Sequence, residues 1–107
     1  AVITGRLGES VDLTAGAAAA QACALMLVAQ IKAALGGLHR VERIVKLGVF
    51  VNSTADFTDQ PKVANGASDL MVALFGEAGK HARSAVGVAS LPLGAAVEVD
   101  AIVQIAV

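Results

Sequence analysis

An arginine among small residues is the first feature of this sequence that could support chemistry. Residues 79–92 read GKHARSAVGVASLP, and Arg83 is followed at alternate positions by Ala85 and Gly87. Successive side chains of a strand point to opposite faces, so these three residues share one face. An arginine fork binds a carboxylate through two parallel hydrogen bonds. Since the small neighbours leave room for a ligand, the pattern is compatible with an anion site at Arg83.

Two acidic residues could complete this site. The pattern predicts C-terminal strands at Ala82–Ala89 and Ala95–Ile105. If these strands pair as a hairpin, Glu98 and Asp100 fall on the face that holds Arg83, and a glutamate there could act as a general base or orient a water. Alternatively, Arg83 forms an ion pair with Glu98 or Asp100 on a solvated sheet face. The pattern alone favours the ion pair, because structural ion pairs are common.

Other candidate residues carry weaker signals. Lys80 and His81 form a small basic cluster that could attract anions, but solvated loop charge is the favoured interpretation. His39 and His81 do not have the spacing of metal ligands, and Cys23 is the only cysteine, so we expect no metal. Cys23 itself is predicted to be a core residue.

The first helix is predicted over residues 14–35. Asp12 or Thr14 can cap its N-terminus, and Gly36 with Gly37 ends it. Its predicted apolar face consists of Leu25, Val28, Ile31 and Leu35. Residues 15–35 are long enough to cross a membrane, but alanine dominates them and polar residues interrupt them. We therefore expect a buried helix and no membrane partner.

The second helix is predicted to begin between Thr58 and Pro61, because proline is tolerated in a first turn. It ends at Gly76 or Gly79. Its interior Asn65–Ser68, NGAS, is poor helix material and predicts a bend or a close approach. The predicted inner stripe consists of Val63, Ala67, Leu70 and Leu74.

Two further strands are predicted at Val2–Leu7 and Arg40–Asn52. In the second of these, both alternating faces are mostly apolar, which predicts a strand covered on both sides. One face should hold Val45, Leu47, Val49 and Val51, and the other should hold Ile44, Lys46, Gly48 and Phe50. The order strand, helix, strand, helix, strand, strand predicts an α+β or α/β sandwich, with both helices on one face of a mixed sheet.

The composition indicates one domain, residues 1–107, that associates with itself. Hydrophobic residues make up 56% of the 107 residues and charged residues 16%, against an ordinary charged share of about 25%. A short chain hides a smaller share of its surface than a long one, so we expect a homo-oligomer with apolar interfaces. The net charge of −1, with no Trp or Tyr, argues against nucleic-acid binding. A single cysteine suits a reducing compartment, and we expect the cytoplasm.

Three segments carry a resemblance to a known family. The C-terminal segment ARSAVGVASLPLGAAVEVDAIVQI has an A-R-S strand, then L-P, then an acidic and apolar strand. The middle segment LGGLHRVERIVKLGVFVNSTADF has a V-x-K strand followed by D-F. The chain resembles the RidA (YjgF-type) reactive-intermediate deaminases, and VANGASDLMVALFGEAGK is similar to a less-characterised, chorismate-mutase-like branch of that family.

The resemblance implies a fold, an assembly and an activity. The fold is the chorismate-mutase-like sandwich of the Bacillus type, assembled as a homotrimer with pockets at subunit interfaces. Arg83 matches the arginine that binds the carboxylate of a 2-imino acid, and Glu98 matches the glutamate that holds the attacking water. Hydrolysis then gives a 2-oxo acid and ammonia without a cofactor. The implied substrate-binding residues are Arg83, Ser84, Ala85 and either Asn65 or Ser68.

The sequence also departs from the family pattern. Many members have proline where this chain has His81, and the well-studied deaminases have cysteine at Ala85. The family begins with a strand hairpin that contains an S-G-Q segment, and we expect the chain to lack it, which would expose a sheet edge. Two alternatives remain open: a trimer that binds small carboxylates or metabolites without turnover and, more weakly, the endoribonuclease activity by which parts of the family are labelled.

Overall fold

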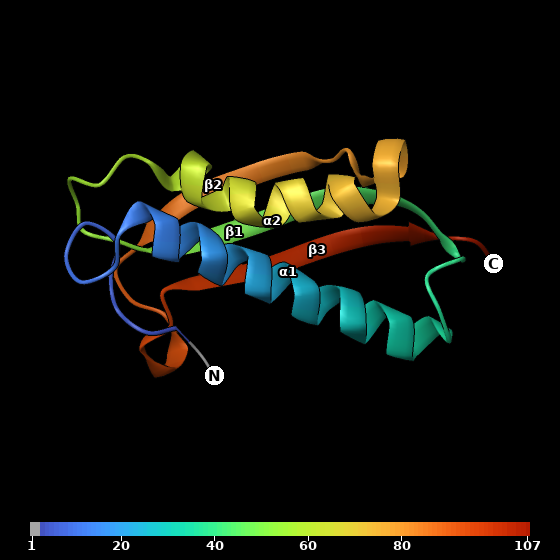
Figure 1. Ribbon diagram of the computed structural model, residues 1–107, viewed down its shortest axis with the longest axis horizontal. Coiled ribbons are helices and arrows are strands. Elements are labelled where there is room, and N and C mark those ends of the chain that lie inside the picture. Colours follow the sequence, from blue (N-terminus) through green and yellow to red (C-terminus); the bar gives the residue numbers. More distant parts are fainter. Residues whose placement is uncertain (1–2) are drawn as a thin grey trace.

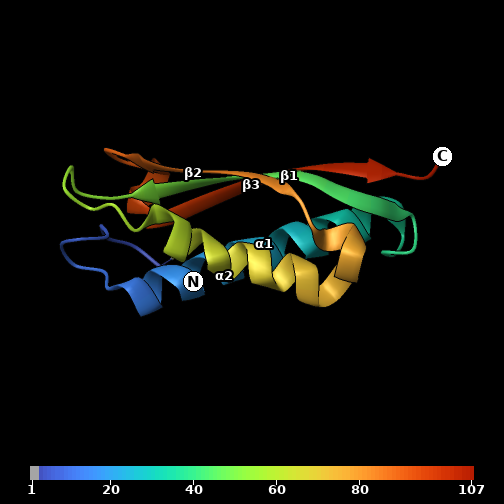
Figure 2. The ribbon, with the colours of Figure 1, turned by 90° about the horizontal axis from the view of Figure 1, so that it is seen from above.

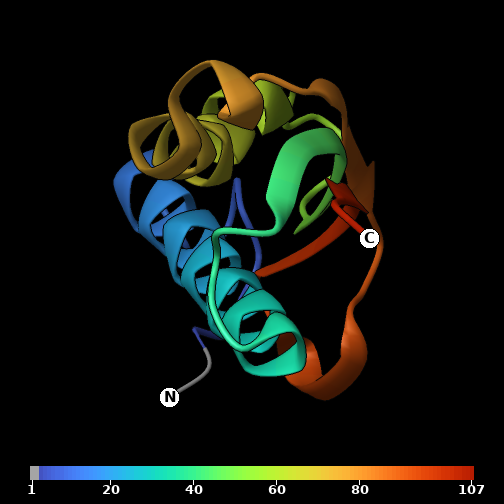
Figure 3. The ribbon, with the colours of Figure 1, turned by 90° about the vertical axis from the view of Figure 1, so that its right-hand side faces the viewer.

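A computed structural model describes residues 3–107. Two helices cover one face of a three-stranded mixed sheet, which confirms the predicted α+β sandwich (Figures 1 and 2). The end-on view shows both helices on the same side of the strands (Figure 3). The elements are α1 (Leu13–Leu35), β1 (Val41–Asn52), α2 (Gln60–Phe75), β2 (Ala82–Val88) and β3 (Val97–Ile105), with short 3₁₀ turns η1 (Gly76–Gly79) and η2 (Pro92–Gly94).

The strand order is β2-β1-β3, so the last two strands do not form a hairpin. β1 lies between them, parallel to β2 and antiparallel to β3. The segment after β2 therefore carries the chain across β1 to its other edge. The most apolar strand takes the centre, where Leu47, Val49 and Val51 are fully buried. The hairpin prediction was wrong because sequence neighbours are not always sheet neighbours.

This order separates the acidic residues from the arginine. Arg83 lies beside Leu47, whose side chain faces the helices. Glu98 and Asp100 lie beside Phe50 and Gly48, which alternate with the core residues of β1 and face away from the helices. Within one chain, the prediction that Arg83 and Glu98 share a face is therefore wrong.

A β-bulge changes the first part of β1. The pairing with β3 is irregular between Ile44 and Lys46, and Ile44 is fully buried. An extra residue in a strand switches the side chains beyond it to the other face. Ile44 therefore joins the core instead of lying on the face of Lys46 and Phe50, as the simple alternation predicted.

Helix α1 begins and ends as its cap residues predict. The Asp12 carboxylate accepts a hydrogen bond from the Ala15 backbone N–H at 2.8 Å, and Gly36 ends the helix with φ 74°. The predicted face was partly wrong, since Leu25 is 50% exposed. Small residues form most of the buried stripe: Gly16, Ala19, Ala20, Ala24 and Val28. By length and apolar composition, α1 could cross a membrane, but here it is a layer of the sandwich.

Helix α2 packs closely against α1. Met71 is fully buried, whereas Leu74, which we predicted to lie inward, is 49% exposed. A side chain at Gly66 would overlap the backbone carbonyl of Ala17. The helix is continuous through NGAS, so this segment marks a close approach and not a bend.

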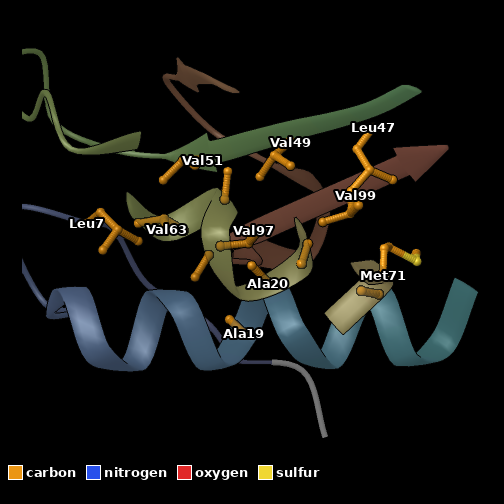
Figure 4. Close-up of a cluster of buried hydrophobic side chains, with 14 of the residues drawn as sticks. Leu7, Ala19, Ala20, Leu47, Val49, Val51, Val63, Met71, Val97 and Val99 are labelled. Atoms are coloured by element: carbon orange, nitrogen blue, oxygen red, sulfur yellow. The ribbon is translucent and has the colours of Figure 1, made fainter. Parts of the chain in front are cut away.

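The core lies between the helices and the sheet, and the chain covers only that side of β1. Figure 4 shows side chains of β1, β3 and both helices meeting in this layer. We call the opposite side the outer sheet face. It contains Lys46, Phe50, Val86, Asp100 and Ile102. No element of residues 3–107 packs on this face as a second layer, so the expected two-sided cover does not come from the described chain.

The N-terminal segment forms isolated bridges instead of the predicted strand. Thr4 bridges to Ala95, and Leu7, which is fully buried, bridges to Ser53. Val2, the first residue of the predicted strand, lies outside the described residues.

Candidate functional site

Arg83 projects from an edge strand toward α2. β2 has β1 as its neighbour on one side only, and Arg83 lies on the helix-facing side of that edge. Its side chain is exposed but reaches two polar residues of α2. The edge position gives the guanidinium access to solvent, and the helix holds it in place.

Two residues of α2 orient the guanidinium. Nη1 of Arg83 donates to Asn65 Oδ1 at 2.7 Å and to Ser68 Oγ at 3.2 Å. Asn65 and Ser68 are three residues apart, a spacing that places side chains on one face of a helix. Both hydrogens of Nη1 are used by these bonds. Among residues 3–107, none accepts a bond from Nε or Nη2, so these two nitrogens of the exposed side chain are available to an external acceptor.

A histidine extends this network. Nε2 of His81 lies 2.8 Å from Ser68 Oγ, and Nδ1 lies 2.6 Å from the carbonyl oxygen of Gly79. His81 is half-buried, so its interpretation as solvated loop charge was wrong. One signal was available: His81 and Arg83 are two positions apart in extended chain, and side chains at that spacing point the same way.

The favoured ion pair of the sequence analysis does not form. The salt bridges in the part of the chain that the structure describes are Arg6–Glu9, Lys62–Asp59 and Lys80–Glu77, and none includes Arg83. Neutral oxygens alone hold the guanidinium, so its positive charge is not balanced by a neighbouring carboxylate. This is the electrostatic condition for binding an external anion.

The other predicted substrate-binding residues divide between the two faces. Ala85 lies beside Val49 on the helix-facing side, half-buried against the core, in line with Arg83. Ser84 lies beside Gly48 and borders a hollow of the outer sheet face with Asp100. Of the predicted set, the structure brings Asn65 and Ser68 to Arg83, keeps Ala85 on the same face and places Ser84 on the other.

Glu98 lies at the opposite edge of the sheet. It borders a groove of about 320 Å³ between α1 and β3, together with Cys23. The pKa of the Cys23 thiol is raised, first by burial and then by the negative charge of Glu98. The thiol also donates a weak hydrogen bond to the Val97 carbonyl at 3.6 Å. Glu98 is therefore near the cysteine and remote from Arg83 of the same chain.

A second arginine, which the sequence analysis did not single out, borders a separate cleft. Arg6 donates to the Ala89 carbonyl at 2.9 Å and to Asn52 Oδ1 at 3.3 Å. The cleft has a volume of about 480 Å³ and also contains Gln60 and Ser53. Within residues 3–107, no group of three His, Cys, Asp or Glu side chains could hold a metal ion.

Comparison with known families identifies the fold. Residues 1–104 match the family described as "YjgF/chorismate mutase-like, putative endoribonuclease". The chain belongs to the YjgF/chorismate mutase-like family. The family relationship covers nearly the whole chain and includes the strand that carries Arg83 as well as the one that carries Glu98.

The chain is also similar to an individual protein over nearly its whole length. Protein TCP17 of Trypanosoma cruzi is 64% identical over 104 residues, which are 96% of this chain and 65% of that protein. The chain thus covers slightly less than two thirds of this relative.

Two crystal structures share the fold. The protein Atu1372, with unknown function, from Agrobacterium tumefaciens has a TM-score of 0.95 at 50% identity, over 96% of this chain and 66% of its own. A "putative endoribonuclease" from Shewanella oneidensis has a TM-score of 0.92 at 33% identity, over 95% of this chain and 68% of its own.

Proposed function

We propose that the protein hydrolyses small 2-imino acids, or the enamines that give rise to them, to 2-oxo acids and ammonia, with Arg83 as the carboxylate anchor. The carrying observation is how the guanidinium is held: Asn65 and Ser68 occupy Nη1, and no residue of 3–107 accepts a hydrogen bond from Nε or Nη2. A carboxylate can accept one hydrogen bond from each of these nitrogens, and such charge-assisted pairs are stronger than neutral hydrogen bonds. Membership of the YjgF-like family supports this proposal.

The catalytic unit we propose is a homotrimer. Arg83 and Glu98 lie on opposite faces of one sheet, so a glutamate that holds water for the Arg83 site must come from a second copy. The outer sheet face supplies an apolar surface for that association, with Val86 44% and Ile102 60% exposed. An intersubunit cleft would then combine Arg83 of one subunit with the glutamate of another.

The alternative is a protein that binds small carboxylates without turnover. The separation of Arg83 and Glu98 within the chain favours it, because the anchor is present and this acid is not beside it. The side chain at Ala85 also offers no nucleophile or proton donor. Both functions use the same fork at Arg83, so the two are distinguished by turnover and not by binding.

The rate of ammonia release tests the proposed hydrolysis and the role of Arg83 in it. An amino-acid oxidase generates 2-imino acids in situ, and the rate of ammonia formation is compared between the parent and Arg83→Ala. Loss of a bidentate, charge-assisted contact should lower kcat/KM by about 100-fold. Lys32→Ala is the control, because Lys32 is exposed on α1, away from the outer sheet face, and its side chain has no hydrogen bond or salt bridge in residues 3–107. An Arg83→Ala rate equal to that of the parent would show that the site assignment is wrong.

Calorimetry, combined with the ammonia assay, distinguishes a carboxylate-binding protein from an enzyme. Binding of a 2-oxo acid that Arg83→Ala abolishes, together with no acceleration of imine hydrolysis, selects the binding protein. An endoribonuclease activity, by analogy with the relatives' description, predicts RNA cleavage that Arg83→Ala removes. Cleavage that survives this substitution indicates a contaminating nuclease.

A further inference from the structure

A buried asparagine holds the second arginine, Arg6, in place. Asn52 is buried at the end of β1, and its Oδ1 accepts a hydrogen bond from Nε of Arg6 at 3.3 Å. The Asn52 amide is fixed in turn, because its Nδ2 donates to the carbonyl oxygen of Ala95 at 3.2 Å. Buried polar atoms need such partners. The core therefore contains an amide that orients a partly exposed guanidinium.

The bonds of the Arg6 guanidinium leave some of its donors free. A guanidinium has five N–H hydrogens. Nε uses one for Asn52, and Nη2 uses one for the carbonyl oxygen of Ala89 at 2.9 Å. Among residues 3–107, none accepts a hydrogen bond from Nη1. Since the side chain is partly exposed, Nη1 is available to an external acceptor.

A glutamine of α2 forms another wall of the cleft that Arg6 borders. Nε2 of Gln60 donates to the Phe57 carbonyl at 2.8 Å and to Ser53 Oγ at 3.4 Å. These bonds use both amide hydrogens, and no donor of residues 3–107 reaches Oε1. A side chain at Gly87 would overlap Nε2, so the glycine makes room for the amide. The cleft thus combines a cationic donor with a neutral acceptor.

The start of α2 adds positive potential to this cleft. The helix begins at Gln60, so the positive end of its macrodipole lies beside the cleft. The N-cap residue Asp59 makes no side-chain cap hydrogen bond, and its carboxylate pairs with Lys62 at 3.7 Å. The helix end is therefore not satisfied by its own cap.

Two exposed carboxylates lie near the rim. Glu9 approaches Nε of Arg6 at 3.9 Å, and Asp56 accepts a hydrogen bond from Thr54, which borders the cleft. Exposed ion pairs are screened by water and salt and contribute little. Glu9 therefore competes weakly with an external anion for Arg6.

We propose that this cleft is a second anion site, which binds a small metabolite with a carboxylate or phosphate group and a hydroxyl or amino donor. The oxyanion accepts from Nη1 of Arg6, and the donor binds Oε1 of Gln60. The volume of about 480 Å³ lies within the usual range for small-molecule sites. The site is independent of the proposed hydrolysis, because Arg83 does not border the cleft and reaches Asn65 and Ser68 farther along α2.

Amide NMR measures binding at this cleft. The probes are lactate and glycerol 3-phosphate, added at constant ionic strength with chloride as the balancing anion. Saturable shifts should appear at the side-chain amide of Gln60 and at the backbone amides of residues 87–89. Arg6→Gln should weaken binding by at least about tenfold, because a hydrogen bond to a charged group is lost. Shifts with only one probe assign the site to that oxyanion class.

A second variant leaves Arg6 unchanged, because Arg6 also connects the N-terminal segment to Ala89. Propionate has the carbon skeleton of lactate without the hydroxyl. The parent should bind lactate more tightly than propionate, and Gln60→Leu should remove this preference. Thermal unfolding shows whether each variant is folded under the conditions of the titration.

Removal of Glu9 tests the charge in the opposite direction. Glu9→Gln should strengthen binding of both probes, because it removes a competing carboxylate from Arg6. Glu77→Gln is the matched control: Glu77 is also exposed and also pairs with a cation three residues away, Lys80.

The outcomes separate this site from the Arg83 site. Arg83→Ala should leave the shifts at Gln60 and at residues 87–89 unchanged. The second site is wrong if neither probe gives saturable shifts there at millimolar concentrations, if the shifts persist in Arg6→Gln, or if Arg83→Ala abolishes them. Ammonia release decides the proposed function separately, since these titrations need no turnover.

Discussion

Arg83 illustrates how neighbouring atoms decide what a charged side chain can do. Two neutral acceptors, Asn65 and Ser68, fix one nitrogen of the guanidinium without neutralising it. A carboxylate at either position would have satisfied the same hydrogen bonds and removed the charge that an anionic ligand needs. Because the partners are an amide and a hydroxyl, Arg83 keeps the positive charge that the proposed anion site requires and does not form a structural ion pair.

Cys23 reports on the position of Glu98. Burial and the charge of Glu98 both disfavour the thiolate and raise the pKa of Cys23. Only the thiolate reacts with iodoacetamide, so alkylation should be slow until the pH exceeds the ordinary range for a thiol. Glu98→Gln removes the smaller of the two causes, and the pH profile of alkylation should shift part of the way toward lower pH.

Alkylation of the parent and of Glu98→Gln can be compared directly, because Cys23 is the only cysteine that reacts. Asp100→Asn is the control, since Asp100 is two positions along the same strand and is not among the causes of the shift. An unchanged profile in Glu98→Gln would place Glu98 away from Cys23 and contradict the geometry of the α1–β3 groove.

At the scale of elements, the approach of the two helices determines where α2 carries Asn65 and Ser68. The buried stripe of α1 consists largely of glycine and alanine, so the backbones can come close together. Gly66, between the two residues that hold Arg83, is the point of contact with Ala17. The packing of the helices and the position of the proposed anion site therefore depend on the same turn of α2.

Gly66→Ala should destabilise the protein although alanine is the better helix former. Helix propensity alone would add about 1 kcal/mol to the free energy of unfolding. The new methyl group would overlap backbone atoms of Ala17, which cannot move without separating the helices, and overpacking of this kind costs about 1–3 kcal/mol. We expect the overlap to dominate and the free energy of unfolding to fall.

Denaturant unfolding measures this change. Ala73→Gly is the control, because Ala73 is exposed on the same helix and should lose stability through propensity alone. A Gly66→Ala variant that is more stable than the parent would show that the helices do not meet at this residue.

Most helices and strands could be predicted from the sequence, but the pairing of the strands in the sheet could not. The caps of α1, the proline at the start of α2 and the apolar run of β1 are local signals, and the structure has these elements close to their predicted bounds. The hairpin prediction failed because alternation shows which residues of a strand share a face and not which strand lies beside it. The bulge at Ile44 was missed for a related reason: it depends on the fit to β3.

At the scale of the whole molecule, the outer sheet face is the feature that a single chain does not explain. A central strand that is apolar on both faces is covered by helices on one side only. Val86 and Ile102 lie exposed on the other side. Burial of this face between copies of the chain would remove apolar surface from water and stabilise the assembly.

Ile102→Lys should dissociate the proposed trimer. The substitution places a charge on the outer sheet face, beside Lys46 of the central strand, and burying an unpaired charge is strongly unfavourable. Sedimentation should give the mass of three chains for the parent and of one chain for the variant. Leu25→Lys is the control, because Leu25 is exposed on α1, on the other side of the molecule, and should leave the mass unchanged. A parent that sediments as one chain would contradict the proposed assembly.

The sequence by itself determined the α+β class and the extent of the helices and of the central strand, and it singled out Arg83 as a candidate for anion binding. These follow from residue types and their periodicity, which act over a few neighbours along the chain. Only the tertiary structure decided that β1 separates Arg83 from Glu98, that Ser84 faces away from the arginine, and that His81 binds Ser68. Each depends on which strand or helix lies beside another, and that is set by the burial of apolar surface over the whole molecule.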